Sequence, residues 1–227
     1  MGVCSKLIYI QRNNRCEWSI MKNGFTLIEL LVVIAILALL LAVLLPSLSK
    51  AKKIAKVTAV NSELRQIGIS LEMYMQENNG KHPPTRKDCS SGWADHQLPP
   101  ELVAGGYLPP PASDSGMSAG IEDRFNPGQT YKYWAVGELY QNGRFMPWKK
   151  ASLYIPEGFP DRHGTPETSP VTWIIYSQGP EFDEWKILKE LNGPVPKRTW
   201  YNPKERKGII TRVRLKGILH DHIGTFK

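Results

Sequence analysis

Glu29 is the one ionisable side chain in the otherwise apolar segment from Phe25 to Leu45. As a helix, this segment would span about 30 Å, which is the thickness of a bilayer core. A carboxylate deep in lipid costs on the order of 2.5–3.5 kcal/mol, so a chain that keeps one there needs a partner for it. These residues therefore indicate a membrane-spanning helix whose single carboxylate has a partner.

A second motif contains a serine that could act as a nucleophile. Residues 116–120 read G-M-S-A-G, which matches the G-x-S-x-G pattern of a hydrolase nucleophile elbow. Such an elbow requires a strand before the serine and a helix after it. Here PPPASDS precedes the motif and IEDRFNPG follows it, and both sequences favour loops. We therefore expect no nucleophilic serine and no enzyme activity.

Acidic residues in the C-terminal half could bind a metal. Glu181, Asp183 and Glu184 offer the hard oxygen ligands that calcium requires. The same segment contains Phe182 and Trp185, and it lacks a run rich in Asp and Gly. A solvated acidic turn is the simpler interpretation. Calcium is therefore kept as a candidate at these three residues, and no cofactor is assigned.

Histidines near the C-terminus form a second potential metal site. In a strand, His220 and His222 would lie on one face, with Asp221 between them. A third and a fourth ligand of suitable spacing are missing from the sequence around them. Exposed histidines are the expected outcome.

The apolar pattern continues beyond Pro46 at helical spacing, which predicts one buried helix face. Its positions are Val57, Val60, Leu64, Ile67, Leu71 and Tyr74. Asn78-Asn79-Gly80 and then Pro83-Pro84 end the pattern. A helix from Phe25 to about Asn78 would be roughly 80 Å long.

The chain after this helix predicts short strands and loops. Residues 98–111 favour a short helix that ends at Gly105-Gly106, and Asn142-Gly143 signals a type I′ hairpin between residues 138–141 and 144–146. Further strands are expected at residues 130–136, 171–177 and 207–216. Because the connections look short or loop-like, we expect an antiparallel sheet. The predicted fold class is α+β: a long N-terminal transmembrane-plus-amphipathic helix packed on a small antiparallel β-sheet domain.

The order G-F-T-L-I-E at residues 24–29 resembles the class III leader of type IV prepilins and type II secretion pseudopilins. An ordinary signal peptide has a shorter apolar core and a small-residue cleavage site after it, whereas here the small residue comes first. The resemblance implies cleavage between Gly24 and Phe25 and N-methylation of Phe25. It also implies that Glu29 meets the N-terminal amine of a neighbouring subunit, and that Pro46 loosens the helix.

The resemblance further implies a division of the chain into four parts. Residues 1–24 are the leader. Within it, we expect residues 1–20 to reflect a translation start assigned too early, and a genuinely long leader is the alternative. Residues 25–45 form the transmembrane helix and residues 46–79 an extended amphipathic helix. Residues 80–227 form a globular, β-rich periplasmic or extracellular domain. Major pseudopilins carry a calcium-binding loop in a comparable C-terminal region, and the acidic segment here departs from its pattern.

The function implied by this resemblance is structural. The chain is expected to be a subunit of a pseudopilus or type IV pilus-like filament, with type II protein secretion as the preferred system. Before assembly it would cross the inner membrane once, with the N-terminus cytoplasmic and the globular domain periplasmic. The implied partners are further copies of itself, other pseudopilins, prepilin peptidase and an inner-membrane assembly platform. The alternative is a membrane-anchored binding module or hydrolase that uses a prepilin-type leader.

The charge of the chain has a simple interpretation. The formal net charge is +8, and lysines cluster just past the apolar segment at Lys50, Lys52, Lys53 and Lys56. These lysines could touch anionic headgroups of a membrane. We expect a solvated helix face rather than a nucleic-acid site.

Overall fold

The computed structural model describes residues 25–87, 96–146, 169, 171–180, 197–216 and 222–225. The chain divides into two compact units, Met1–Ser47 and Leu48–Lys227. One helix, α1 (Leu27–Glu77), runs from the first unit into the second and contains Pro46. The long helix expected from the apolar pattern is thus confirmed. Its first and last residues each lie within two residues of the expected boundaries.

The described part of the first unit is the apolar start of α1. Its most apolar stretch has a mean hydropathy of 3.2, and none of it is buried within the protein. The helix is therefore long and apolar enough to cross a membrane.

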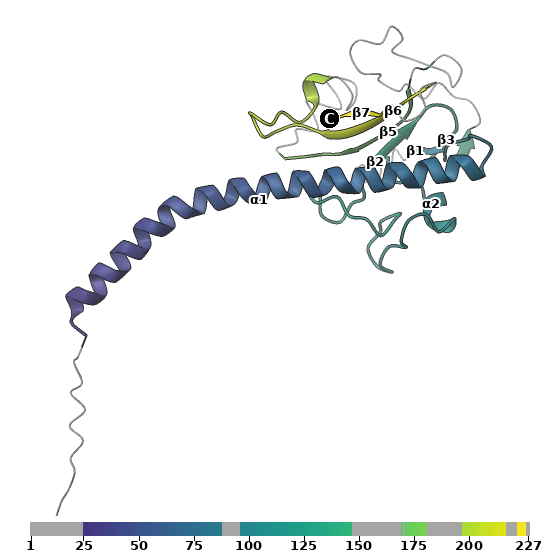
Figure 1. Cartoon of the computed structure of the whole chain (residues 1–227). Coiled ribbons are helices and arrows are strands. Elements are labelled where there is room, and N and C mark those ends of the chain that lie inside the picture. Colours follow the sequence, from purple (N-terminus) through teal and green to yellow (C-terminus); the bar gives the residue numbers. More distant parts are fainter. Residues whose placement is uncertain are drawn as a thin grey trace, which may run out of the picture. The chain divides into compact units, whose positions relative to one another are not determined.

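Two β-sheets occur among the described residues of the second unit (Figure 1). The four-stranded sheet has the order β2-β5-β6-β7 and is antiparallel throughout. Its strands are β2 (Lys132–Ala135), β5 (Val171–Ser177), β6 (Ile210–Leu215) and β7 (His222–Gly224). The three-stranded sheet has the order β1-β3-β4. Its strands are β1 (Thr85–Lys87), β3 (Leu139–Gln141) and β4 (Arg144–Met146).

The sequence patterns locate most of these elements. Asn142 and Gly143 have φ values of 51° and 74°, and the strands on either side pair as the type I′ signal predicts. The short helix α2 (Glu101–Ala104) ends at Gly105, also as expected. One expectation needs correction, because β1 pairs with β3 in parallel. More than fifty residues separate the two strands in the chain, which leaves enough length for the crossover that parallel pairing requires.

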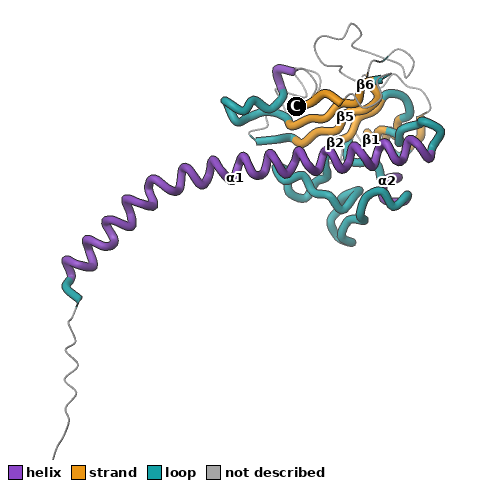
Figure 2. Tube along the Cα trace, in the orientation of Figure 1, coloured by secondary structure: helices purple, strands orange, loops and turns teal. Residues whose placement is uncertain are grey.

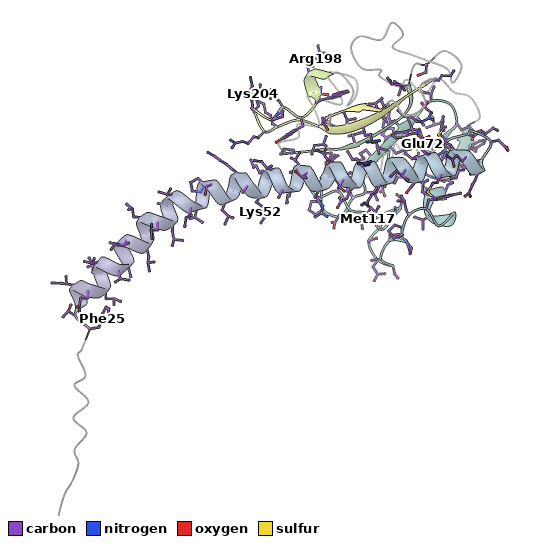
Figure 3. All side chains as sticks on the ribbon, viewed as in Figure 1. Phe25, Lys52, Glu72, Met117, Arg198 and Lys204 are labelled. Atoms are coloured by element: carbon purple, nitrogen blue, oxygen red, sulfur yellow. The ribbon has the colours of Figure 1, made fainter. Side chains whose placement is uncertain are left out.

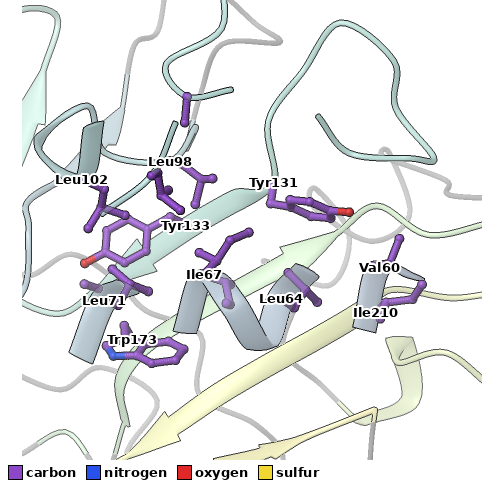
Figure 4. Close-up of a cluster of buried hydrophobic side chains, with 14 of the residues drawn as sticks. Val60, Leu64, Ile67, Leu71, Leu98, Leu102, Tyr131, Tyr133, Trp173 and Ile210 are labelled. Atoms are coloured by element: carbon purple, nitrogen blue, oxygen red, sulfur yellow. The ribbon is translucent and has the colours of Figure 1, made fainter. Parts of the chain in front are cut away.

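The second half of α1 packs against the four-stranded sheet, and α2 lies on the other side of the helix (Figures 1 and 2). Val60, Leu64, Ile67 and Leu71 are all fully buried, as their spacing predicts (Figure 4). Their partners in the core are Leu98, Leu102, Tyr131, Tyr133, Trp173, Ile175 and Ile210. This cluster fixes the helix to the sheet.

The buried stripe on α1 ends differently from the prediction. Met75 closes it, whereas Tyr74 is only half-buried and meets Tyr107 edge to face at 5.9 Å between ring centroids. The physical reason is that an α-helix turns every 3.6 residues, so a stripe with alternating gaps of three and four slowly rotates away from the face it started on.

Strand β5 is buried on both faces. Trp173 and Ile175 belong to the cluster that contains α1, and Ile174 and Tyr176 belong to a second cluster with Val213. Alternate residues of a strand point to opposite faces, so each face of β5 contributes to a separate core. This explains why the strand is apolar along nearly its whole length.

The loop before β2 is fastened to both the helix and the sheet. The Asp123 carboxylate accepts hydrogen bonds from Ser177 Oγ at 2.6 Å and from the Gln178 N–H at 3.1 Å. Burial raises the pKa of Asp123. On the helix side, Arg124 and the Tyr131 hydroxyl both donate to Glu63. These contacts hold the loop in place over α1.

Candidate processing and assembly site

Thr26 and Glu29 form reciprocal hydrogen bonds at the start of α1. The Thr26 N–H and the Thr26 hydroxyl each donate to Glu29 Oε2 at 2.8 Å. The Glu29 N–H donates in turn to Thr26 Oγ1 at 3.2 Å. Thr26 immediately precedes the first helical residue, so the pair is a capping box. Thr26 was not among the predicted site residues, although T-x-x-E before an apolar run is the signature of this box.

The surroundings of Glu29 are apolar and uncovered. Phe25, Leu27 and Ile28 are 72%, 79% and 74% exposed. Among the described residues, the hydrogen-bond donors to the Glu29 carboxylate are all neutral. They satisfy acceptor positions, but they do not neutralise its charge. A lipid environment would therefore leave a charged group that still needs a cation.

Phe25 lies four residues before Glu29 in the chain. Cleavage of the bond between Gly24 and Phe25 would place a new α-amine directly before Thr26, within about one helical turn of Glu29. The ammonium and the carboxylate would then lie at similar depth in a bilayer. The arrangement can form an ion pair, either within one chain or between neighbouring copies.

Pro46 lies inside α1, as expected. It has no N–H to donate to the carbonyl of Ala42, four residues earlier, so one helical hydrogen bond is missing there. The hydroxyl of Ser47 donates to the Leu44 carbonyl at 2.8 Å in the same turn. The boundary between the two compact units falls just after Ser47. Pro46 therefore marks the end of the apolar part of the helix.

Residues 21–45 match the family model of the prokaryotic N-terminal methylation motif. The chain carries a prepilin-type leader. The match includes Gly24, Phe25 and Glu29, and the long apolar helix that follows the prepilin-type leader fits a pilin-like protein. No curated protein and no solved structure matches the chain.

Several of the other predicted site residues lie outside the part of the chain that the structure describes. Gly24 of the leader and the acidic candidates Glu181, Asp183 and Glu184 lie outside the described residues. Of the histidine pair, only the backbone of His222 is described, in β7. In the described ranges, no group of three or more His, Cys, Asp or Glu side chains could hold a metal ion. Residues 116–120 lie in a loop with no adjoining strand or helix, so a nucleophile elbow is not formed there.

A pocket of about 300 Å³ lies where α1 ends against the sheets. Met75, His82, Val136 and Arg214 are among the residues that line it. Arg214 pairs with Glu72 of α1 and donates to Thr172 Oγ1 at 3.3 Å. His82 Nδ1 lies 3.2 Å from the Pro83 carbonyl oxygen. These polar groups join the end of the helix to the sheet, so the pocket belongs to the structural contact between them.

His82 makes this contact sensitive to pH. Burial lowers the pKa of His82, and it outweighs the carbonyl groups of Pro83 and Val136 and the charge of Glu138, which all favour the imidazolium. The charge of Arg214 acts in the same direction as burial. As the pH falls below about 6.5, the His82 imidazole therefore becomes protonated in the unfolded chain before it does so in the folded chain. This difference favours the unfolded state, so the folded state loses stability in that pH range.

We expect the thermal unfolding temperature of the second unit to fall between neutral and mildly acidic pH, and to fall less in the variant His82→Gln. Tryptophan fluorescence of the detergent-solubilised chain measures both. The variant must melt cooperatively at neutral pH to serve as the comparison. An equal loss in wild type and variant would assign the pH dependence to other groups.

Proposed function

We propose that this chain is a structural subunit of a pseudopilus or type IV pilus-like filament, processed by prepilin peptidase and assembled from the inner membrane. The observation that carries the proposal is the Glu29 carboxylate, which lies about one helical turn after the expected cleavage site, in a helix whose apolar side chains are exposed. Among the described residues, its hydrogen-bond donors are all neutral. A plain membrane anchor has no use for this charge, whereas a filament subunit uses it to set the register of the next copy.

The assembly step follows from the cost of the two charges. A cleaved subunit in the bilayer carries an ammonium at Phe25 and a carboxylate at Glu29. A subunit that joins a filament brings its ammonium to the Glu29 carboxylate of a neighbour, and both groups leave the lipid as a pair. The exposed apolar side chains of the same helix then pack among identical helices, which replaces lipid contacts with protein contacts.

Type II protein secretion is the machine that we propose for this filament. Support comes from the segment of residues 98–111, which resembles the L…GYL…P segment that follows the long helix in major pseudopilins. Here Tyr107 of that segment packs on Tyr74, and the Ser70 hydroxyl donates to the Tyr107 carbonyl at 3.0 Å. The segment thus lies against α1. We place the N-terminus in the cytoplasm and the globular domain in the periplasm.

The experiment compares cells that express this chain with and without prepilin peptidase. We expect the chain in the sheared extracellular or pseudopilus fraction only where the peptidase is present, and in the membrane fraction otherwise. Recovery from the membrane fraction alone in both strains would contradict a filament and favour the membrane-anchored module.

A further inference from the structure

The direction of β6 along α1 locates the loops at each end of the second unit. A Cβ atom at Gly68 would lie 3.0 Å from Arg212 Nε, and Arg214 pairs with Glu72. Two strand residues advance about 6.8 Å and four helix residues about 6 Å, so the two elements keep step. Strand β6 therefore runs alongside α1 in the same direction.

The residues before β6 lie at the end of the second unit where its part of α1 begins. Ile210, the first residue of β6, packs in the cluster that contains Val60 (Figure 4). Residues 202–207 precede it and form a turn, in which the Asn202 N–H donates to the Lys207 carbonyl at 2.9 Å. Because β6 runs in the same direction as α1, this turn lies toward the part of the helix that precedes Val60. Figure 3 shows Lys204 and Lys52 at this end of the unit.

Several lysine and arginine side chains lie at this end of the second unit. The members of the basic end, as we name it, are Lys50, Lys52, Lys53 and Lys56 of α1 and Lys204, Arg206 and Lys207 of the turn. Glu205 is the acidic residue of the turn, and it pairs with Lys207 at 3.4 Å. Along α1, no Asp or Glu occurs between Glu29 and Glu63. The basic end therefore carries a net positive charge from two segments that are far apart in the sequence.

Several side chains of the basic end face solvent. Lys50, Lys52 and Lys204 are exposed. The Lys56 ammonium donates to the Arg124 carbonyl at 3.3 Å and lies 5.7 Å from the centre of the Phe125 ring, neither of which is an anion. Its positive charge thus adds to that of its neighbours.

We propose that the basic end binds the anionic phospholipid headgroups of the bilayer that holds the apolar part of α1. The inference rests on the proposed function, because it needs the helix to be anchored in a membrane. Lys50 follows Leu45 by a helical rise of about 7.5 Å, which is the depth of the headgroup layer when residues 25–45 fill the hydrocarbon core. The chain itself thus brings Lys50 to the depth of the lipid phosphates, and the exposed Lys52 and Lys204 extend the positive charge from there. Nothing in the described residues positions a nucleic acid there.

Lipid binding explains an unusual charge distribution. Cytoplasmic flanks of membrane helices normally carry the excess of Lys and Arg. Removal of the leader takes away Lys22, and the basic residues that remain nearest to the apolar segment are then on the far flank. Anionic headgroups on that side hold the globular domain against the membrane until the subunit is withdrawn into a filament. The attraction is electrostatic, so salt weakens it.

The test uses the mature chain, residues 25–227, in nanodiscs of phosphatidylcholine alone or mixed with phosphatidylglycerol. Cys89, the one cysteine after leader removal, is changed to serine, and a nitroxide is attached at Pro203→Cys in the turn. A second sample carries it at Gln76→Cys, near the other end of α1. We expect phosphatidylglycerol to reduce the access of a neutral, water-soluble nickel chelate to the label in the turn by at least about twofold, with reversal in high salt. The Gln76 label should not respond.

The double variant Lys52→Gln/Lys204→Gln should remove most of this protection. The matched control Lys81→Gln/Arg144→Gln deletes the same charge from exposed sites outside the basic end and should keep it. Equal access in both lipids, or equal losses in both double variants, would overturn the proposal. So would protection of the turn by a DNA duplex in discs that lack phosphatidylglycerol. A chain that enters no disc would refute the membrane anchor itself, and with it the proposed function, whereas lipid-independent access in a disc-bound chain refutes the headgroup contact alone.

Discussion

Replacing Glu29 with alanine should reduce recovery of the chain in the filament fraction by on the order of a hundredfold, which corresponds to the 2.5–3.5 kcal/mol of one unpaired charge in lipid. The variant should enter the membrane at least as well as wild type, because an apolar residue replaces a charged one. Leader cleavage should continue, since the scissile bond is unchanged. Shear fractions and immunoblots of the membrane fraction, taken from the same culture, measure both outcomes.

The capping box provides the control for this result. Thr26→Val removes the hydroxyl that bonds Glu29 but keeps the carboxylate, and loss of a cap costs about 1 kcal/mol. We expect only a mild assembly defect from it, and partial function from Glu29→Asp, which keeps the charge on a shorter stem. If Thr26→Val blocked assembly as strongly as Glu29→Ala, helix capping would be the role of Glu29. Normal polymerisation of the alanine variant would refute the pairing and favour the anchored module.

The second large effect is expected at Gly179, where the chain leaves β5. Gly179 has φ +70°, and an added Cβ would lie 2.0 Å from the Gly208 carbonyl oxygen. That oxygen belongs to the backbone, so it cannot move aside without displacing the start of β6. Gly179→Ala should therefore lower the free energy of unfolding by about 4 kcal/mol or more, because backbone strain and a steric clash add.

Gly80 is the matched control for this substitution. It has φ +77°, but no atom lies within 4 Å of the position that its Cβ would take. Gly80→Ala should cost only about 1–2 kcal/mol, the price of a left-handed backbone alone. Urea unfolding followed by tryptophan fluorescence compares the two. Equal destabilisation would show that Gly208 does not confine Gly179 in the folded protein.

Much of the fold could be predicted because its signals are local. The residues of β5 form one apolar run, and Asn142-Gly143 specifies a turn in which both residues take positive φ. Strand β1 could not be found in this way, because its sequence, T-R-K, has neither length nor alternation. Its pairing with β3 depends on a contact between distant segments.

The candidate site was predictable to a similar extent. Glu29 stands out as the one charge in an apolar segment, and Gly24 and Phe25 precede it in a specific order. The neutrality of its donors could not be read from composition, because it follows from the geometry of Thr26. Only the lysines of α1 in the basic end could be predicted from the sequence. Lys204 lies at the same end as Lys52 because β6 runs alongside α1 in the same direction. The sequence shows which residues are charged, and the tertiary packing determines which of them lie close together.

The mature N-terminus is the most direct test of a processed pilin-like subunit. Mass spectrometry of the chain extracted from membranes that contain prepilin peptidase should find N-methylated Phe25 as the first residue, with residues 1–24 absent. An intact leader, or cleavage beyond Leu45, would contradict processing at Gly24–Phe25 and the assembly mechanism built on the new amine.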